Sequence, residues 1–236
     1  MKIPKIHGYI ERRILINYVI DATVAARMIP PPFRPKLYNG KAIGGICLIR
    51  LKSIKPKGLP NIIGISSENA AHRFAVEWDE DGEVKEGVYI SRRDTSSALN
   101  AVAGGRFFPG RHHLSTFTVT KGNANYSVGF TNRDTTSISI QARKAAHFND
   151  GSIFKTLDTA SSFFEKGCLG FSPNKNSYDG LKLASYTWKV QPLEVSNVSS
   201  SYFENENLFP KGSIIFDNAL LMTNIEHEWH PVQLKP

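Results

Sequence analysis

The sequence predicts a mainly β fold with a few short helices, arranged as a barrel or sandwich of antiparallel or mixed strands. Three observations support this prediction. About ten short stretches are rich in β-branched, aromatic or alternating apolar residues, as strands are. Many of them are joined in pairs by turn residues, which is typical of hairpins. About three short segments have helical spacing, too few for a doubly wound α/β sheet.

The first strand and helix follow from composition and from capping residues. Residues 13–20 are rich in Ile, Leu, Val and Tyr, which predicts a strand. Asp21 is a typical N-cap for a helix over 22–29, and the three prolines at 30–32 end that helix. A mostly apolar stretch with two glycines predicts the next strand at 42–51.

A hairpin and a second helix are expected next. Residues 71–78 and 86–91 read as two strands joined by the turn Asp79-Glu80-Asp81-Gly82. Asp94 is a second candidate N-cap, which would open a helix over 95–103. The remaining strands are expected at 114–121, 126–131, 137–143, 181–192 (with Trp188 in the strand), 193–203 and 213–222.

The third helix is expected over residues 156–167. Leu157, Ala160, Phe163 and Phe164 recur at helical spacing and predict an amphipathic helix whose apolar side packs on the core. The polar tail Glu226-His227-Glu228-Trp229-His230 has a composition that resembles a metal site. Because it follows the last apolar run, we expect it to be a solvated chain end.

Composition indicates a soluble globular protein with one domain over residues 1–236. The chain is 41% hydrophobic and 21% charged, and its length allows a sizeable core. Cys47 lies in an apolar run and is expected in the core, and with Cys168 as the second cysteine we expect no disulfide framework and no metal site. No stretch approaches the roughly 18 apolar residues of a membrane span. We therefore expect a cytoplasmic protein with no membrane partner.

The net charge of +8 raises the question of nucleic-acid binding. The basic residues are spread along the chain and do not cluster with interleaved aromatic residues, as a nucleic-acid surface would require. We therefore expect no nucleic-acid partner.

The densest group of reactive side chains lies at residues 104–113. Arg106 and Arg111 are candidates to bind a carboxylate through paired hydrogen bonds, or they are structural arginines. His112 and His113 are candidate proton carriers, or structural histidines. They are neighbours at the start of a strand, so only one of them can face a cavity.

The order of several short motifs resembles a known family. The motifs are Met28-Ile29-Pro30-Pro31-Pro32-Phe33, Tyr38-Asn39-Gly40-Lys41-Ala42, Glu68-Asn69-Ala70-Ala71-His72-Arg73-Phe74, Gly87-Val88-Tyr89, the 106–113 segment, Phe163-Phe164-Glu165 and the region around Trp188. From about His7 to about Pro231 the chain resembles the YqjF-like proteins of unknown function (domain of unknown function 2071), which are similar to the acetoacetate decarboxylase superfamily. The resemblance implies a cone-shaped, partly open β-barrel with an internal ligand cavity, often dimeric.

The resemblance does not extend to the decarboxylase chemistry. Acetoacetate decarboxylases form a Schiff base through one of two adjacent lysines. The matching stretch here places Gly110 at the nucleophile's position and Arg111 at that of its cationic neighbour. The superfamily's early arginine also has no clear counterpart in Tyr18-Val19-Ile20-Asp21. We therefore expect no acetoacetate decarboxylase activity and no cofactor. Migration of another lysine, such as Lys121, into the cavity is a weaker alternative.

Two residues of the 68–74 motif complete the candidate site. Glu68 lies where the superfamily places carboxylates near the cavity, and it is a candidate general base or a partner of Arg73 or Arg92. His72 and Arg73 lie on opposite faces of their strand, and Arg73 is the preferred inward residue and ligand contact.

Two functional hypotheses follow. In the first, a small organic acid or keto compound binds in the cavity, oriented by Arg106 or Arg111, and Glu68 with His112 or His113 performs acid–base chemistry. In the second, the chain is a non-catalytic ligand-binding module or a structural homodimer. Convergence of Arg111, a histidine and Glu68 in one pocket would favour the first hypothesis.

Overall fold

A ring of strands forms the body of the protein. The computed structural model describes residues 5–103, 110–174 and 177–234. In hydrogen-bonding order the ring consists of β1 (Ile6–Asp21), β4 (Lys41–Pro56), β5 (Ile65–Glu80), β6 (Glu83–Thr95), β11 (Leu169–Pro173), β12 (Tyr178–Ser185) and β14 (Ile214–Gln233). β14 pairs again with β1, so the sheet closes on itself without forming a regular barrel. Neighbouring strands are antiparallel except β6 and β11.

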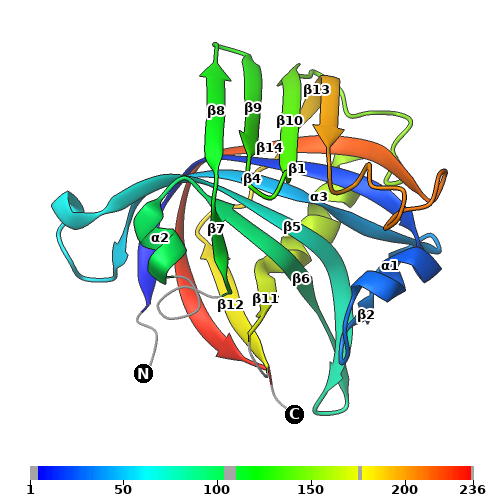
Figure 1. The fold of residues 1–236 in the computed structure, drawn as a ribbon, viewed down its shortest axis with the longest axis horizontal. Helices are drawn as coiled ribbons and strands as arrows, with labels where there is room; N and C mark the ends of the chain where they lie inside the picture. Colours follow the sequence, from blue (N-terminus) through cyan, green and yellow to red (C-terminus); the bar gives the residue numbers. More distant parts are fainter. Residues whose placement is uncertain (1–4, 104–109, 175–176, 235–236) are drawn as a thin grey trace.

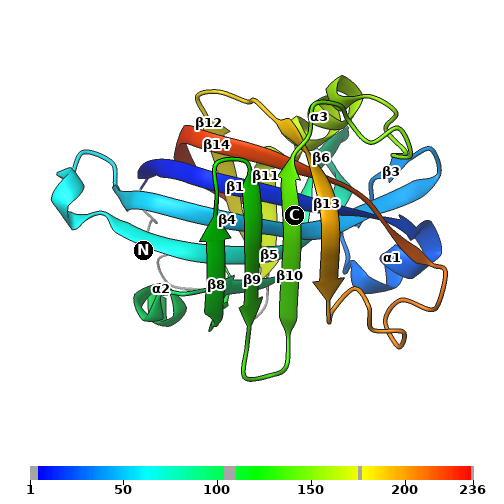
Figure 2. The ribbon, with the colours of Figure 1, turned by 90° about the horizontal axis from the view of Figure 1, so that it is seen from above.

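A second layer of strands covers one side of the ring. It is built from β13 (Gln191–Ser200), β10 (Ser137–Lys144), β9 (Asn125–Thr131) and β8 (Thr116–Lys121), and β13 joins it to β14. Figure 2 shows these strands crossing β1, β4 and β5 at a steep angle. Such crossings are typical of orthogonal packing between sheets, with a core enclosed where the two layers face each other.

Short elements complete the described chain. The helices are α1 (Ala22–Met28), α2 (Ala98–Ala103) and α3 (Leu157–Glu165), with 3₁₀ turns η1 (Asn61–Ile63) and η2 (Lys166–Cys168). The short strands are β2 (Arg34–Pro35), β3 (Leu37–Tyr38) and β7 (His112–Leu114). α1 lies beside the ring at the end of β1, and α2 lies at the opposite end of the molecule (Figure 1).

The ring has an apolar core on each of its faces. Ile14 of β1 belongs to the core under the second layer, together with Val128 and Ile140. The next residue, Leu15, belongs to the inner core, which α3 fills with Phe164. Because successive strand residues point to opposite faces, a wall that is buried on both sides needs the continuous apolar runs seen in β1 and β4. The mainly β fold class is confirmed.

Three expected elements differ from the structure. β6 continues through Thr95, so Asp94 is a buried strand residue and α2 begins only at Ala98. Residues 186–190 are not strand, which places Trp188 in a connection between β12 and β13. The tail at 226–230 is not a solvated end: it forms part of β14, paired with both β1 and β12, and His227 is fully buried. Pairing across the chain termini is a tertiary effect that local composition does not reveal.

Candidate anion site inside the ring

The register of three strands brings arginine side chains to the inner face of the ring. Residues paired across neighbouring strands point to the same face, as do residues two apart on one strand. Cys47 of β4 pairs with Ala71 of β5, which pairs in turn with Arg93 of β6. Arg73 follows two residues after Ala71 on β5. The inner face therefore carries Arg93, Cys47 and Arg73 in adjacent positions.

Arg13 joins this group from β1. Leu15 of β1 pairs with Cys47, and Arg13 lies two residues before Leu15 on the same face. Ala71 and Gly45, which occupy neighbouring positions in the register, have small or no side chains. Long guanidinium side chains from three strands therefore have room to extend inside the ring.

Arg13 makes its inner contacts with sulfur and aromatic groups. Its Nε donates to Sγ of Cys47 over 3.0 Å, and its Nη1 lies 3.9 Å from Sδ of Met222. Its guanidinium carbon lies 5.9 Å from the ring centroid of Trp188. This is the distance at which an aromatic face attracts a cation.

Arg73 is held by an amide and an aromatic ring. Its Nη2 donates to Oδ1 of Asn17 over 2.6 Å, and its guanidinium carbon lies 5.2 Å from the ring of Phe164. The residue is 4% exposed, and its Nε has no hydrogen-bond partner among the described atoms. Burial lowers the pKa of Arg73 to about 10, while Cys47 acts in the opposite direction. The guanidinium remains charged at neutral pH.

Arg93 of β6 lies on the same inner face, across β5 from Cys47. Its Nε donates to Oγ of Ser172 over 2.9 Å, and its Nη2 is buried without a partner among the described atoms. Burial lowers its pKa to about 10, opposed by Cys47 and Asp179. Within the described residues, no carboxylate forms an ion pair with Arg13, Arg73 or Arg93. The three guanidinium groups therefore lie inside the ring without an ion-pair partner among the described residues.

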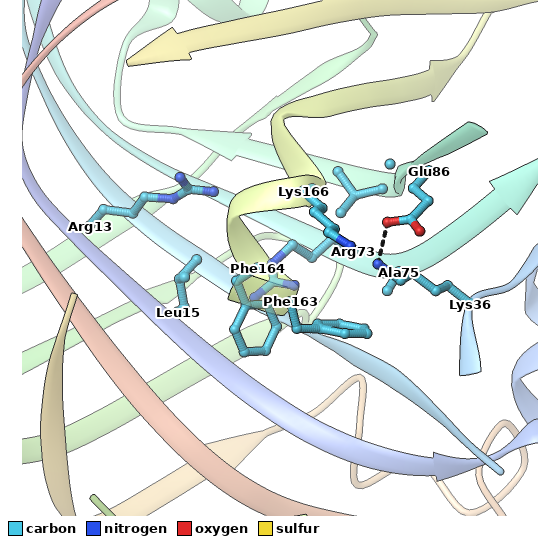
Figure 3. Close-up of a pocket in the computed structure, with 12 residues that line it drawn as sticks. Arg13, Leu15, Lys36, Arg73, Ala75, Glu86, Phe163, Phe164 and Lys166 are labelled. Atoms are coloured by element: carbon cyan, nitrogen blue, oxygen red, sulfur yellow. Dashed lines mark hydrogen bonds and ion pairs between the residues drawn. The ribbon is translucent and has the colours of Figure 1, made fainter. Parts of the chain in front are cut away.

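A small pocket opens onto two of these arginines. Arg13 and Arg73 line it together with Phe163 and Phe164 of α3, and Lys36 and Lys166 also border it. Figure 3 shows Arg13 reaching into the pocket from one side and Lys36 from the other, with Lys36 paired to Glu86. Its volume is about 20 Å³, room for about one water molecule. A guanidinium group binds a carboxylate through two parallel hydrogen bonds, so the pocket can hold the carboxylate end of a small molecule.

The structure places the pair His72 and Arg73 on opposite faces, with Arg73 inside the ring. His72 lies in the other core, 5.0 Å from the ring of Tyr202 by centroid distance. His112 and His113 also separate: in β7 they pair with Arg93 and Asp94 of β6, which point to opposite faces. His112 therefore lies on the side of Arg93, and burial lowers its pKa to about 3.

The structure does not bring Glu68 to this group. Glu68 lies two residues before Ala70, which belongs to the core under the second layer, so Glu68 faces away from the inside of the ring. Its Oε2 accepts from Nη2 of Arg12 over 2.5 Å. Arg111 is exposed, and Arg106 lies outside the described residues. The expected convergence of Arg111, a histidine and Glu68 in one pocket is therefore not seen.

Sequence reasoning missed Arg13 and Arg93 as residues of this group, whereas Cys47 lies in the core as predicted. Arg12-Arg13 and Arg92-Arg93 are adjacent pairs in strands, so one member of each must face inward. That alternation was the available signal. It could not say which member faces the cavity, because β-bulges shift the register near both pairs. The pocket-lining residues Lys36 and Lys166 were missed as well. Lys121, the lysine considered as a possible cavity residue, is exposed instead.

Gly110, the residue at the expected nucleophile position, has a left-handed backbone conformation and lies against Ser172. Its φ is +73°, and a Cβ placed there would lie 2.6 Å from Cβ of Ser172. Its N–H donates to Oδ2 of Asp179 over 3.0 Å, and Nδ1 of His112 donates to its carbonyl over 3.2 Å. A side chain at this position would therefore displace the strand beneath it.

Comparison with known proteins gives a family and a fold. The family model DUF2071, described as an uncharacterized conserved protein, matches residues 10–221. No curated protein sequence matches the chain. Among the described residues, no helix is long and apolar enough to cross a bilayer.

Several solved structures share the fold at low identity. An acetoacetate decarboxylase-like enzyme from Sphingomonas wittichii RW1 aligns with a TM-score of 0.60 and 10% identity, over 100% of this chain and 94% of the other. Acetoacetate decarboxylase from Legionella pneumophila aligns with a TM-score of 0.60 and 11% identity, over 98% and 87%. The enduracididine biosynthesis enzyme MppR, complexed with pyruvate, aligns with a TM-score of 0.60 and 9% identity, over 100% and 92%.

Proposed function

Since this chain belongs to the DUF2071 family of uncharacterized conserved proteins, we propose a function from its own site: it binds a small organic acid inside the ring. The observation that carries the proposal is the unpaired charge of Arg73. This guanidinium is 4% exposed, faces Arg13 across the pocket and has no carboxylate partner among the described residues. A buried charge without a counter-ion is costly, and an anionic ligand supplies that counter-ion.

The size and lining of the pocket specify the ligand. The inner space holds about one water molecule, so only the carboxylate oxygens of a ligand can enter it and the rest of the molecule would lie at the pocket mouth. Phe163 and Phe164 supply an apolar wall for a short carbon chain. Lys36 and Lys166 add positive charge to the lining, and the amine of Lys36 forms an ion pair with Glu86. The favoured ligands are carboxylates of two to four carbons, keto acids included.

We do not extend the proposal to imine chemistry. The nucleophile position of the decarboxylases falls on Gly110, which has no amine. Lys36, which lines the pocket, is held in an ion pair with Glu86. Acid–base catalysis by Glu68 and His112 has no support from the geometry, since the two lie on opposite faces of the ring wall. Binding of an organic acid is the function that the arginines support.

Calorimetric titration with acetate, pyruvate and a neutral analogue, acetamide, tests the proposal. We expect both carboxylates to bind and acetamide not to. Arg73→Gln is expected to weaken carboxylate binding by about 10- to 100-fold, the range for loss of a charge-assisted hydrogen-bond pair. Arg143→Gln is the matched control, because Arg143 pairs with Glu194 on the exposed surface of the second layer.

The outcomes separate the two functional hypotheses. Equal affinity of Arg73→Gln and Arg143→Gln would show that the carboxylate binds elsewhere. Absence of binding by every carboxylate would leave the arginines as structural groups and favour a non-catalytic structural module, such as a homodimer. Borohydride treatment in the presence of pyruvate adds a separate check, since a covalent adduct on Lys36 or Lys166 would contradict the exclusion of imine chemistry.

A further inference from the structure

The lining of the pocket carries more positive charge than one carboxylate can balance. Arg13, Arg73, Lys36 and Lys166 border it, and Glu86 is the one carboxylate in its lining among the described residues. The lining therefore has a net formal charge of three positive units at neutral pH. A ligand with one carboxylate leaves two of these charges without a counter-ion, whereas a ligand with two carboxylates leaves one.

The four cations form an inner pair and an outer pair. Arg13 and Arg73 project from the strands of the ring, and Arg73 is 4% exposed. Lys36 lies between β2 and β3, and Lys166 is an exposed residue of η2. Figure 3 shows Lys166 between Arg13 on one side and Lys36 on the other. Because the enclosed space holds about one water molecule, a ligand whose carboxylate contacts the arginines has its other end at the mouth, which the lysines border.

Two contacts hold the amine of Lys36 at this mouth. Its Nζ donates to Oε2 of Glu86 over 2.5 Å and lies 4.4 Å from the ring centroid of Phe163, which is part of the pocket wall. The Lys36 side chain is 14% exposed. An ammonium group has three N–H donors, and Glu86 accepts one of them. The amine is therefore fixed over the wall with donors left for a second acceptor.

Lys166 adds a charge that no carboxylate balances. Within the described residues Lys166 forms no ion pair. A single exposed lysine is normally a solvated surface group. Lys166 differs because it borders the same pocket as three other cations. Charges of the same sign repel one another, so an anion placed between them stabilises all of them.

We propose that the pocket binds a small dicarboxylate, with one carboxylate on Arg13 and Arg73 and the other at the mouth on Lys36 and Lys166. The proposal rests on the proposed function, because the first carboxylate uses the same two arginines. It narrows the ligand class from organic acids in general to diacids of three or four carbons. Binding requires no covalent step and no co-reactant.

Diacids and their monoamides test the proposal directly. Succinate and succinamate have nearly the same size, as do malonate and malonamate, but each monoamide has a single carboxylate. In calorimetric titrations near pH 7.5, we expect at least one diacid to bind about tenfold more tightly than its monoamide, the effect of two partly exposed ion pairs. This ratio should shrink in about 0.5 M sodium chloride, because salt screens charges at the mouth. Equal affinities of diacid and monoamide in both pairs would overturn the proposal.

Three variants assign the second carboxylate to the mouth. Lys166→Gln should weaken binding of the preferred diacid about fivefold and change that of its monoamide less than twofold. Glu86→Gln removes the competing carboxylate and should have the opposite effect, strengthening diacid binding by about threefold. Lys121→Gln is the matched control, because Lys121 is an exposed lysine of β8 outside the pocket lining. Equal diacid affinities of Lys166→Gln and Lys121→Gln would show that the second carboxylate lies elsewhere.

The effect of Arg73→Gln separates this proposal from the proposed function. If this variant weakens the diacid and the monoamide alike, and the native protein binds the two equally, the mouth does not recognise a second carboxylate and the binding function stands. If the native protein binds neither compound, both proposals are wrong. A preference for the diacid that is lost in Lys166→Gln, together with loss of both ligands in Arg73→Gln, supports the dicarboxylate assignment.

Discussion

Nη2 of Arg73 donates to Oδ1 of Asn17, and this bond is the first of a buried relay that ends on a carboxylate. Nδ2 of Asn17 donates to Oδ1 of Asn218 over 2.8 Å, and Nδ2 of Asn218 donates to Oδ2 of Asp217 over 2.5 Å. Every amide in the relay has its oxygen toward the guanidinium and its nitrogen toward the carboxylate. The relay thus fixes the orientation of Arg73 without placing a negative charge beside it.

Asn17→Ala should therefore loosen Arg73 and destabilise the fold. The substitution leaves Nη2 of Arg73 and Oδ1 of Asn218 buried without partners, which costs about 1 to 3 kcal/mol for each group. We expect urea denaturation to show a loss of about 3 kcal/mol and calorimetry to show weaker carboxylate binding. Asn197→Ala, at an exposed position of β13, is the control and should change neither quantity. Unchanged stability of Asn17→Ala would mean that the relay is not formed.

Lowering the pH should reduce the free energy of unfolding of the protein because of His72. Burial lowers the pKa of His72 to about 4, and neither ring nitrogen has a partner among the described atoms. The unfolded chain takes up this proton near pH 6.5, and the folded chain takes it up only near pH 4. The stabilisation is therefore complete above about pH 6.5 and is lost as the pH falls to about 4. One such group contributes about 1.4 kcal/mol per pH unit, or about 3 kcal/mol over the interval.

His72→Phe isolates this contribution. The ring of His72 packs against Tyr202 and Phe130, so a phenyl ring suits the site. We expect the free energy of unfolding of the variant to fall less steeply between pH 6.5 and 4, while His112 and His227 retain their share of the slope. Denaturant titrations at four pH values measure it. Identical slopes for the two proteins would show that His72 is protonated in the folded state at these pH values.

Gly110 and Gly40 have nearly the same backbone conformation and allow a clean comparison. Their φ angles are +73° and +75°, but a Cβ at Gly110 would meet Ser172 at 2.6 Å, whereas one at Gly40 would meet nothing within 4 Å. Gly40→Ala should cost about 1 kcal/mol for the left-handed conformation alone. Gly110→Ala should cost about 2 to 4 kcal/mol, since overpacking is added.

The same comparison bears on the decarboxylase resemblance. Ser172→Gly should recover part of the loss in Gly110→Ala and none of the loss in Gly40→Ala, because the clash is with Ser172 itself. Gly110→Lys should be destabilised in the same way and should form no borohydride-trapped adduct with pyruvate. Equal costs for alanine at the two glycines would show that the 110 segment shifts freely away from Ser172.

Local sequence patterns predicted the elements of the fold but not their closure into a ring. Alternation and turn residues predicted the hairpin of β5 and β6, and Thr156 caps α3 by accepting from the N–H of Thr159 over 3.1 Å. The pairing of β1 with β14 joins opposite ends of the sequence, and no local pattern encodes it. Burial of His227 depends on this pairing, which is why the tail prediction was wrong.

The site was predicted only in part, for a related reason. Alternation correctly predicted that His72 and Arg73 face opposite ways, and it predicted the same separation for His112 and His113. The role of Arg73 as a ligand contact stays a prediction. For Arg13 and Arg93, the inward member of each pair depends on bulges at Ile10/Arg12 and His72/Arg73. A single extra residue in a strand reverses every face after it, and composition does not reveal where that residue is.

Glu68→Gln should destabilise the fold and leave carboxylate binding intact. Glu68 is the 2.5 Å partner of Arg12, whose side chain is 4% exposed, and Nε of Arg50 lies 3.9 Å from its other oxygen. Removing the charge of Glu68 leaves the Arg12 guanidinium buried without a counter-ion, a loss of about 3 kcal/mol. The site arginines lie on the opposite face of the wall, so the dissociation constant for pyruvate should stay within about twofold.

The double variant Arg12→Met/Glu68→Leu distinguishes a lost ion pair from a lost catalytic group. Replacing both charges by apolar side chains of similar size removes the uncompensated cation, so we expect stability to return close to that of the native protein. Arg73→Gln should show the reverse pattern, with weak binding and nearly native stability, because an unpaired buried charge is removed. If Glu68→Gln instead loses pyruvate binding while its unfolding free energy is unchanged, then Glu68 acts in the site despite its position on the outer face.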